Sequence, residues 1–258
     1  MLGERARKRY PTNPKEDGMT MQTSPIETRD VVSHEEWLSR RTAFLAREKE
    51  FTRLRDELTR ERSELPWEEV TRSYVFEGPN GKQQLADLFG DKSQLIIYHF
   101  MFDPSWDAGC KSCSFVADNF DGATVHLGAR DTAFAVISRA PFEKIARFKQ
   151  RMGWRFPWLS SFGTEFNYDY GVTTDESHTV YNYVDVAAQP AGRPYKGERE
   201  GLSVFVRDGD RVFHSYSAYQ RGLDLLLNTY NLLDLTPLGR NENGQIMSWL
   251  KYHDQYQG

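Results

Sequence analysis

The sequence predicts an α/β protein with a mixed central sheet flanked by helices, and three observations support this prediction. The apolar runs at 95–102 and 132–138 are rich in β-branched and aromatic residues, which is typical of buried strands. A segment with helical spacing follows each run, one from Cys110 and one from 141 to 152, so the two strands are expected to be parallel. The segment 202–216 alternates around Asp-Gly-Asp, which predicts an antiparallel hairpin.

Composition and charge limit the class of protein. The chain has 258 residues, 39% hydrophobic and 27% charged, which is ordinary for one main globular domain with extensions. A net charge of −4 provides no general attraction for nucleic acid or for an anionic membrane, so neither is expected as a partner. The basic N-terminus is not followed by the apolar run of a secretory signal, and we expect a cytoplasmic protein.

The first 65 residues are predicted to form a disordered leader and one helix. Residues 1–30 carry charge, Pro and Gly without periodic apolar positions. Over 31–65 we expect an amphipathic helix that begins at a capping box of Ser33 and Glu36 and ends before Pro66. Its apolar stripe recurs every seventh residue: Trp37, Phe44, Phe51, Leu58 and Leu65.

Two interpretations of this stripe remain open. In the first, the stripe packs on the domain that follows. In the second, it forms a dimerising coiled coil, which makes a homodimer possible, although Arg41, Glu48 and Arg55 occupy positions that should complete the seam.

Short elements follow Pro66. We expect a strand at 74–76, a turn at 78–81, and a short strand or helical turn at 84–89 that closes at Gly90. The helix from Cys110 is expected to keep one apolar stripe as far as Leu127. The aromatic stretch 154–159 is interpreted as core rather than as a substrate platform. Residues 189–201 are expected to form a polar loop, a closing helix is expected at 220–234, and the tail 241–258 is expected on the surface.

Cys110 and Cys113 are the only cysteines and open a predicted helix at the end of the first buried strand. Residues three apart lie on one helix face, so the two sulfurs can meet. The N–H groups and dipole of a first helical turn favour an anion, and Lys111 adds a cation, whereas Asp103 and Asp107 oppose it. Such settings lower a cysteine pKa from about 8.5 into roughly 3.5 to 7.5.

A lone Cys-x-x-Cys in a reducing compartment is catalytic or metal-binding more often than structural. A metal site would add His99 and His126 to the cysteines, but the second histidine of a zinc-finger spacing is missing. We therefore interpret His99 as a core residue and His126 as a partner of a helix end. Neither a nucleotide-binding glycine pattern nor a serine nucleophile elbow is present, and no cofactor and no metal are expected.

The order strand, Cys-x-x-Cys helix, strand, helix, hairpin, helix is similar to the thioredoxin fold. Peroxiredoxin-like landmarks are NGK to DLF at 80–89, FAVIS at 134–138, FPWLS at 156–160 and YDYGV at 168–172. More specifically, the chain from about 32 to 240 resembles the bacterial family of domain of unknown function 899. The segments that carry this resemblance are YHFMF at 98–102, AGCKSCSF at 108–115, ADNFDG at 117–122, SRAP at 138–141 and RMGWRFPW at 151–158.

The resemblance implies a thioredoxin-like domain over 66–240 and a dithiol–disulfide oxidoreductase whose partners are protein or small-molecule thiols and disulfides. By position, Cys110 would be the attacking thiolate and Cys113 the resolving thiol. The candidate supporting residues are Lys111, Ser112, Trp106 and Gly201, of which Gly201 stands where thioredoxins place a cis-proline.

Three alternatives to this activity remain. Peroxiredoxins carry Pro-x-x-x-Thr/Ser-x-x-Cys around the reactive cysteine. Counted from Pro104, the hydroxyl position holds Ala108 and the cysteine position holds Lys111, so the hydroxyl of a peroxiredoxin site is missing. A thiol peroxidase that uses Cys110 differently is one alternative. A redox-sensing or protein-interaction module without turnover is the second, and metal binding is the third.

Overall fold

A computed structural model of the chain describes residues 29–188, 196–242 and 244–256. The predicted leader, 1–30, lies almost wholly outside these residues. The chain divides into two compact units, 1–47 and 48–258, and helix α1 (His34–Ser63) contributes to both. The backbone N–H of Glu36 donates to Ser33 Oγ over 3.2 Å, so the predicted cap is present.

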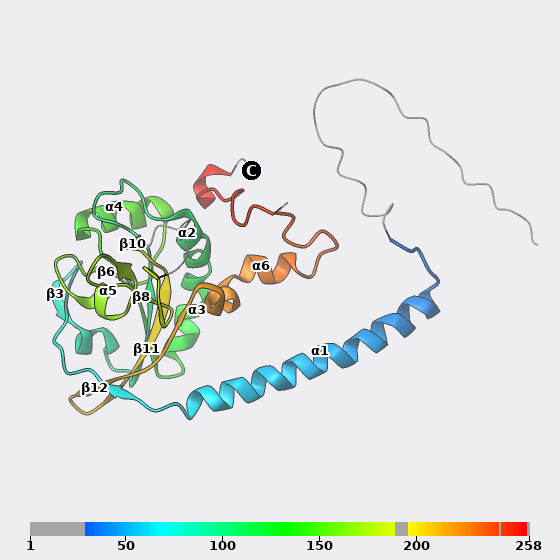
Figure 1. The fold of residues 1–258 in the computed structure, drawn as a ribbon, viewed down its shortest axis with the longest axis horizontal. Helices are drawn as coiled ribbons and strands as arrows, with labels where there is room; N and C mark the ends of the chain where they lie inside the picture. Colours follow the sequence, from blue (N-terminus) through cyan, green and yellow to red (C-terminus); the bar gives the residue numbers. More distant parts are fainter. Residues whose placement is uncertain (1–28, 189–195, 243, 257–258) are drawn as a thin grey trace, which may run out of the picture. The chain divides into compact units, whose positions relative to one another are not determined.

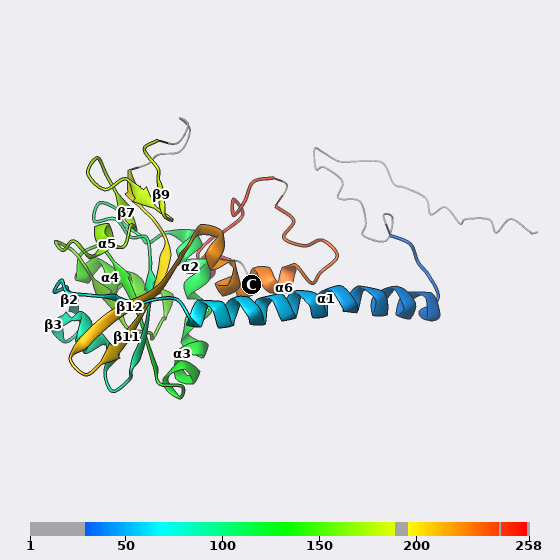
Figure 2. The same cartoon turned by 60° about the horizontal axis from the view of Figure 1, so that its bottom comes forward.

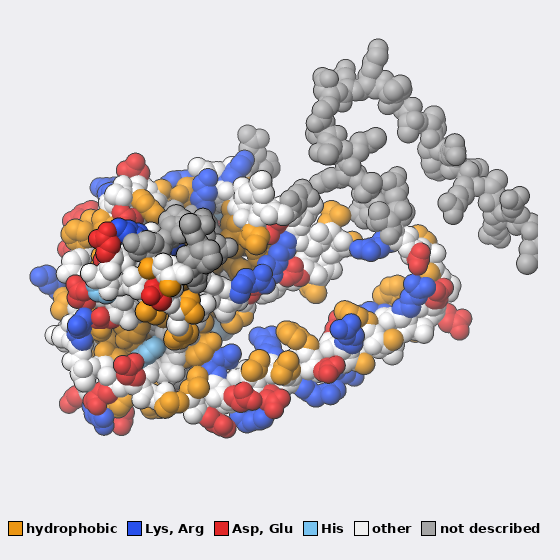
Figure 3. Space-filling view, viewed as in Figure 1, with side chains coloured by type: hydrophobic (Ala, Val, Ile, Leu, Met, Phe, Trp, Pro, Cys, Tyr) orange, Lys and Arg blue, Asp and Glu red, His pale blue; other side chains and the backbone are white. Residues whose placement is uncertain are grey.

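The apolar stripe of α1 is exposed. No residue of α1 is buried, and its hydrophobic side chains alternate with charged ones along the helix (Figure 3). Phe51 and Leu58, which belong to the second unit, are 68% and 49% exposed. The expectation that the stripe packs on the following domain is therefore wrong for this part of the helix. The stripe has one apolar residue in every two turns, whereas a helix that faces a core presents three or four apolar residues over the same length.

The second unit is built on an eight-stranded sheet with the order β1-β12-β11-β4-β5-β6-β2-β3. Figure 1 labels β3, β6, β11 and β12 of this sheet. Two small antiparallel pairs, β10 with β7 and β8 with β9, accompany it. The strands are β1 (Glu68–Glu69), β2 (Val75–Gly78), β3 (Gly81–Gln84), β4 (Gln94–His99), β5 (Thr132–Ser138), β6 (Trp158–Ser160), β7 (Thr173–Thr174), β8 (Val180–Tyr181), β9 (Val184–Asp185), β10 (Gly197–Glu198), β11 (Gly201–Asp208) and β12 (Arg211–Tyr219).

The centre of the sheet is parallel and its flanks are antiparallel. β4 pairs with β5 in parallel, with Ile97 opposite Ala135, and β5 pairs with β6 in parallel. β11 runs antiparallel to β4 and forms the predicted hairpin with β12 (Figure 2). The predicted α/β class, with a mixed thioredoxin-like sheet flanked by helices, is thus confirmed.

Two predicted helices are each divided in the structure. Asn119 interrupts the helix that follows Cys110, because its Nδ2 donates to the carbonyls of Phe115 and Val116 over 3.1 and 3.3 Å. The closing helix breaks at Leu227, whose ψ of 68° is not helical. The remaining helices are α2 (Lys111–Ala117), α3 (Phe120–Gly128), α4 (Phe142–Met152), α5 (Phe166–Asp169) and α6 (Asn228–Leu233), with 3₁₀ turns η1 (Leu85–Phe89), η2 (Gln220–Leu226) and η3 (His253–Gln255).

Each face of the sheet carries its own core. One core packs α2, α3, α4 and α6 against the sheet, and the other packs η1 and α5. Trp154, Phe156 and Trp158 are 7%, 2% and 1% exposed, so the interpretation of this aromatic stretch as core is confirmed. Among the described residues, no helix is both long enough and apolar enough to cross a membrane.

The C-terminal tail does more than lie on the surface. Most of its side chains over 244–256 are exposed, as expected. However, Leu250 is only 5% exposed, and Met247 and Tyr252 pack against the core that contains Cys113. The surface expectation is therefore wrong for these three side chains, because an apolar residue gains free energy when it covers a core edge.

Candidate functional site

The Cys-x-x-Cys pair lies where the chain leaves β4 and enters α2. Cys110 is the N-cap residue of α2, and its N–H donates to the carbonyl of Met101 over 3.0 Å. The carbonyl of Cys110 accepts from the N–H and the hydroxyl of Ser114 over 2.9 and 2.8 Å. These bonds hold the backbone around the first sulfur, at the carboxyl end of a parallel strand, where open α/β sheets place their sites.

Gly109 allows this tight entry into the helix. A Cβ added at Gly109 would lie 2.6 Å from the ring of Phe100 and 2.9 Å from the ring of Phe148. The chain therefore approaches two core rings more closely than a side chain permits, and glycine is required immediately before Cys110.

The Cys110 thiol is half-buried and favours its ionised form. Its Sγ lies 3.0 Å from Ser112 Oγ. The side-chain hydrogen bond with Cys113 is the largest influence and, with the bonds from Ser112, lowers the pKa of Cys110 to about 6 although burial opposes this. Most of this thiol is therefore thiolate at neutral pH.

The second sulfur has the opposite properties. Cys113 is 1% exposed, and both cysteines are free thiols. Burial, followed by the interaction with Cys110, raises the pKa of Cys113 well above its ordinary value. The pair thus combines one thiolate with one thiol that keeps its proton, an arrangement in which neighbouring groups take different chemical roles.

The supporting residues predicted from sequence do not all meet at the sulfurs. Ser112 does, through its hydroxyl. Lys111 is exposed and has no hydrogen bond or ion pair to any described residue. Trp106 is 38% exposed, and its carbonyl accepts a hydrogen bond from Lys144 Nζ over 3.0 Å. This residue therefore helps to hold the loop between β4 and α2.

Gly201 is a buried residue at the start of β11, opposite His99 of β4. An added Cβ would lie 2.8 Å from the ring of Tyr219 and 3.0 Å from Val172, so close packing accounts for the glycine. The described part of the chain contains no cis peptide bond.

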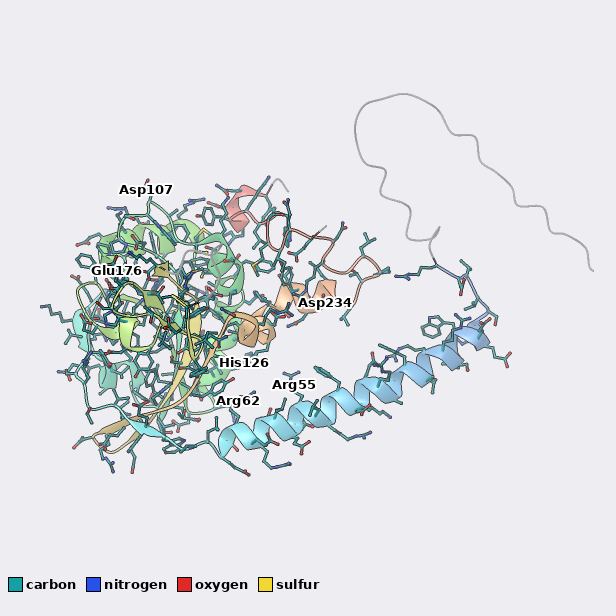
Figure 4. All side chains as sticks on the ribbon, in the orientation of Figure 1. Arg55, Arg62, Asp107, His126, Glu176 and Asp234 are labelled. Atoms are coloured by element: carbon teal, nitrogen blue, oxygen red, sulfur yellow. The ribbon has the colours of Figure 1, made fainter. Side chains whose placement is uncertain are left out.

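The two histidines considered as metal ligands lie apart from the sulfurs. His99 is 1% exposed and its Nε2 is 2.8 Å from Ser203 Oγ, while Nδ1 has no hydrogen-bond partner among the residues that the structure describes. Burial lowers the pKa of His99 to about 3, so it is a neutral core residue. His126 lies in the last turn of α3 (Figure 4). Over 29–188, 196–242 and 244–256, no group of three or more His, Cys, Asp and Glu side chains is placed to hold a metal.

A partly buried ionic cluster beside the site was not foreseen from the sequence. Arg139 donates to Glu198 over 2.8 Å, to Asp103 over 2.9 Å and to the hydroxyl of Tyr168 over 2.9 Å. The side chain of Glu198 is 1% exposed. This cluster joins the loop after β4 to the chain before β11. In the sequence, Arg139 falls in the Ser-Arg-Ala-Pro segment at 138–141 and Glu198 falls in the polar loop at 189–201. Neither pattern indicates that Arg139 pairs with Glu198.

A cavity of about 480 Å³ borders the second sulfur. Cys113, Ser112 and Tyr98 contribute to one wall. Glu200 also lines it, and burial raises the pKa of this carboxyl. The other lining residues include three arginines and several apolar side chains: Val116, Tyr181, Arg199, Gln220, Arg221, Leu223, Asp224, Leu227, Tyr230, Arg240, Ile246 and Met247.

The sheet and the cysteines together define a thioredoxin-like α/β protein with a Cys-x-x-Cys pair at the N-terminus of the helix after a parallel strand. The chain belongs to the family described as bacterial protein of unknown function (DUF899), whose model matches residues 26–256. The resemblance noted in the sequence is therefore confirmed. No match was found among curated proteins.

Several solved structures are similar to the chain. A mutant of PrxQ from Xylella fastidiosa is 12% identical, with a TM-score of 0.40 and coverage of 62% of this chain and 88% of that one. A mutant of peroxiredoxin Q from Xanthomonas campestris is 12% identical, with a TM-score of 0.42 and coverage of 65% and 98%. Peroxidoxin BcpB from Mycobacterium tuberculosis is 18% identical, with a TM-score of 0.39 and coverage of 66% and 97%.

Proposed function

We propose that this protein is a dithiol–disulfide oxidoreductase in which Cys110 is the attacking thiolate and Cys113 the resolving thiol. One observation carries the proposal: Cys110, at the helix N-cap, bonds through Sγ to Ser112, whereas Cys113, one turn further, is buried. The attacking nucleophile must be ionised and accessible. The resolving thiol must lie close to it and stay protonated until the mixed disulfide has formed.

The reaction follows from these two environments. The Cys110 thiolate attacks one sulfur of a disulfide, forms a mixed disulfide and releases the first thiolate. Cys113 then loses its proton and attacks Cys110 Sγ, which forms the Cys110–Cys113 disulfide. The second substrate thiol leaves and carries the proton, so the substrate gains the two electrons that the protein loses.

A redox-sensing module without turnover is the second candidate. The observation that favours it is the half-burial of Cys110, because a sensor thiol needs to meet a small oxidant but not a folded partner. The two candidates differ in whether the disulfide, once formed, is exchanged repeatedly with thiols.

A thiolate titration tests the proposal. The reduced protein and its Cys110→Ser and Cys113→Ser variants are titrated by ultraviolet thiolate absorbance, with the double variant as a blank because the chain has only two cysteines. We expect Cys110 to titrate below about 7 and the pair to cycle reversibly in glutathione redox buffers. If both thiols titrate near or above about 8.5 and no disulfide forms, the proposal fails. Repeated exchange, measured as multiple turnovers per protein, separates an oxidoreductase from a sensor.

A further inference from the structure

The segment 244–256, which we call the C-terminal strap, is attached to the chain on both sides of Cys110. The hydroxyl of Tyr252 donates to the carbonyl of Gly109 over 2.7 Å. The ring of Tyr252 packs edge-on against Phe148 of α4, with centroids 5.5 Å apart. Two parallel bonds of 2.8 and 2.9 Å join Arg151 of α4 to Asp254. Paired Arg–carboxylate bonds of this kind fix geometry as well as charge.

The strap is also attached to α2 and to the residue that ends it. His253 Nδ1 lies 2.6 Å from Asp118 Oδ1. The ring of Trp249 meets Phe115 edge-on at 5.7 Å. Figure 1 shows this red C-terminal segment beside α2. Together these contacts place the strap along α2, from Gly109, just before the N-cap residue Cys110, to Asp118 at the other end of the helix.

This arrangement limits what can reach the first sulfur. A disulfide in a folded protein carries polypeptide on both sides, and that polypeptide must lie along the surface around Cys110. The strap already occupies the carbonyl of Gly109, the residue immediately before Cys110. The carbonyl of Gly109 is therefore already bonded when the backbone of a partner protein approaches Cys110. A small molecule does not need to lie along this backbone.

The cavity beside Cys113 offers space of the right size for a small molecule. Its volume of about 480 Å³ lies within the range of roughly 300 to 1,000 Å³ that small-molecule sites have. Ser112 lines it, and Ser112 Oγ is 3.0 Å from Cys110 Sγ, so the cavity ends beside the first sulfur. Ile246 and Met247 of the strap form part of its wall, so the segment that bonds to Gly109 also shapes this space.

The charges around the cavity favour an anion. Its lining contains Arg199, Arg221 and Arg240, against the two carboxyls of Glu200 and Asp224. Burial raises the pKa of the Glu200 carboxyl. Asp224 pairs with Arg221 and lies 3.7 Å from Arg240, whose closer partner is Asp234, 2.8 Å away and outside the lining. The lining itself carries three guanidinium groups and two carboxyls, and arginine suits carboxylate ligands.

We infer that the disulfide reduced at this site is a low-molecular-weight one that carries carboxylates, bound in the cavity beside Ser112 and Cys113, and that the C-terminal strap excludes folded proteins. This inference rests on the proposed function and names its substrate class. The balanced reaction converts one small disulfide and the protein dithiol into two small thiols and the Cys110–Cys113 disulfide.

The test measures single-turnover oxidation of the reduced full chain by three disulfides. Glutathione disulfide is small and carries carboxylates, 2-hydroxyethyl disulfide is small and uncharged, and insulin is a protein disulfide. Each rate is divided by the rate of the same disulfide with free dithiothreitol to remove intrinsic reactivity. We expect glutathione disulfide to exceed 2-hydroxyethyl disulfide by about tenfold at low salt, and insulin to be slower by about a hundredfold.

Two variants separate the strap from the cavity. Tyr252→Ala combined with Asp254→Ala removes the attachments of the strap to Gly109 and to α4, and the insulin rate is expected to rise by about tenfold. Glu143→Ala is the control, because it removes an exposed carboxylate of α4 that has no hydrogen bond or ion pair to the described residues. Arg221→Gln is expected to slow glutathione disulfide and to leave 2-hydroxyethyl disulfide unchanged.

The outcomes distinguish the inference from the proposed function. If the wild-type chain reduces insulin as well as glutathione disulfide, the inference is overturned and the oxidoreductase activity stands. The same holds if charge makes no difference between the two small disulfides. If none of the three disulfides oxidises the pair, the proposed function fails and the inference fails with it. The wild-type ranking decides these cases even where a strap variant does not fold.

Discussion

The hydroxyl of Ser112 lies 3.0 Å from Cys110 Sγ, within the first turn of α2. This contact is the nearest support of the thiolate apart from Cys113, and it comes from one of the two residues between the cysteines. Lys111, the other one, is exposed. The local chemistry of the pair therefore depends on a neutral hydroxyl rather than on a neighbouring cation.

Ser112→Ala tests this support. The variant loses a hydrogen bond to a charged sulfur, so the pKa of Cys110 is expected to rise by roughly half a unit to one unit. Thiolate absorbance measures the change. Ser114→Ala is the matched control, because the Ser114 hydroxyl bonds to the Cys110 carbonyl and not to its sulfur. An equal rise in both variants would show that helix capping, and not the Ser112 hydroxyl, sets the pKa.

The stability of the reduced protein is expected to depend on pH through Cys110. Its pKa is lowered from 9.0 to about 6 in the folded chain, so its contribution is fully present above pH 9.0 and is lost as pH falls through about 6. Cys113 has a raised pKa in the folded chain, so below about pH 8 it keeps its proton in both states and adds no slope there. Urea unfolding should show a slope of up to about 1.4 kcal/mol per pH unit that Cys110→Ser removes. An unchanged slope in that variant would assign it to other groups.

Arg139→Met is expected to be strongly destabilising because it leaves Glu198 buried without its partner. The loss should be about 3 to 5 kcal/mol in the free energy of unfolding, and Arg139→Met with Glu198→Gln should recover part of it. Arg72→Gln provides the comparison, since the side chains of Arg72 and Asp169 are 54% and 30% exposed and such a pair contributes at most about 1 kcal/mol. Similar losses in both single variants would contradict a special role for the ionic cluster.

Gly109→Ala should disturb the entry to α2. The new Cβ meets the rings of Phe100 and Phe148, and overpacking of this kind costs about 1 to 3 kcal/mol. Gly122→Ala in α3 is the control, because nothing lies within 4 Å of its Cβ position and alanine favours a helix by about 0.5 to 1 kcal/mol. Thermal or urea unfolding measures both variants. A stable Gly109→Ala protein would mean that the two rings move aside easily.

Phe51→Ser tests whether the stripe of α1 has a partner in solution. Phe51 is 68% exposed, so in a monomer the substitution should change the free energy of unfolding by less than about 0.5 kcal/mol. If the stripe forms a homodimer, sedimentation should show a dimer of the wild-type chain that the variant weakens. Glu50→Ser serves as the control on the same helix.

Where periodicity is strong, the sequence predicts the element closely. The strand at 132–138 and the helix that ends at Met152 coincide with β5 and α4. The helix from Cys110 was predicted as one piece because its apolar stripe continues. The break at Asn119 depends on a side chain that bonds to the helix backbone, which an apolar pattern does not reveal.

The α/β class and the place of the two cysteines at the start of a helix after a buried strand follow from the sequence, because they depend on periodicity and spacing along the chain. The family follows from segments that resemble it, such as AGCKSCSF at 108–115. The tertiary structure alone decided which neighbours each sulfur has. Arg139 meets Glu198 across 59 residues, and Tyr252 meets Gly109 across 143 residues. Pairings at such separations depend on how the whole sheet and its coverings pack, and no local pattern encodes them.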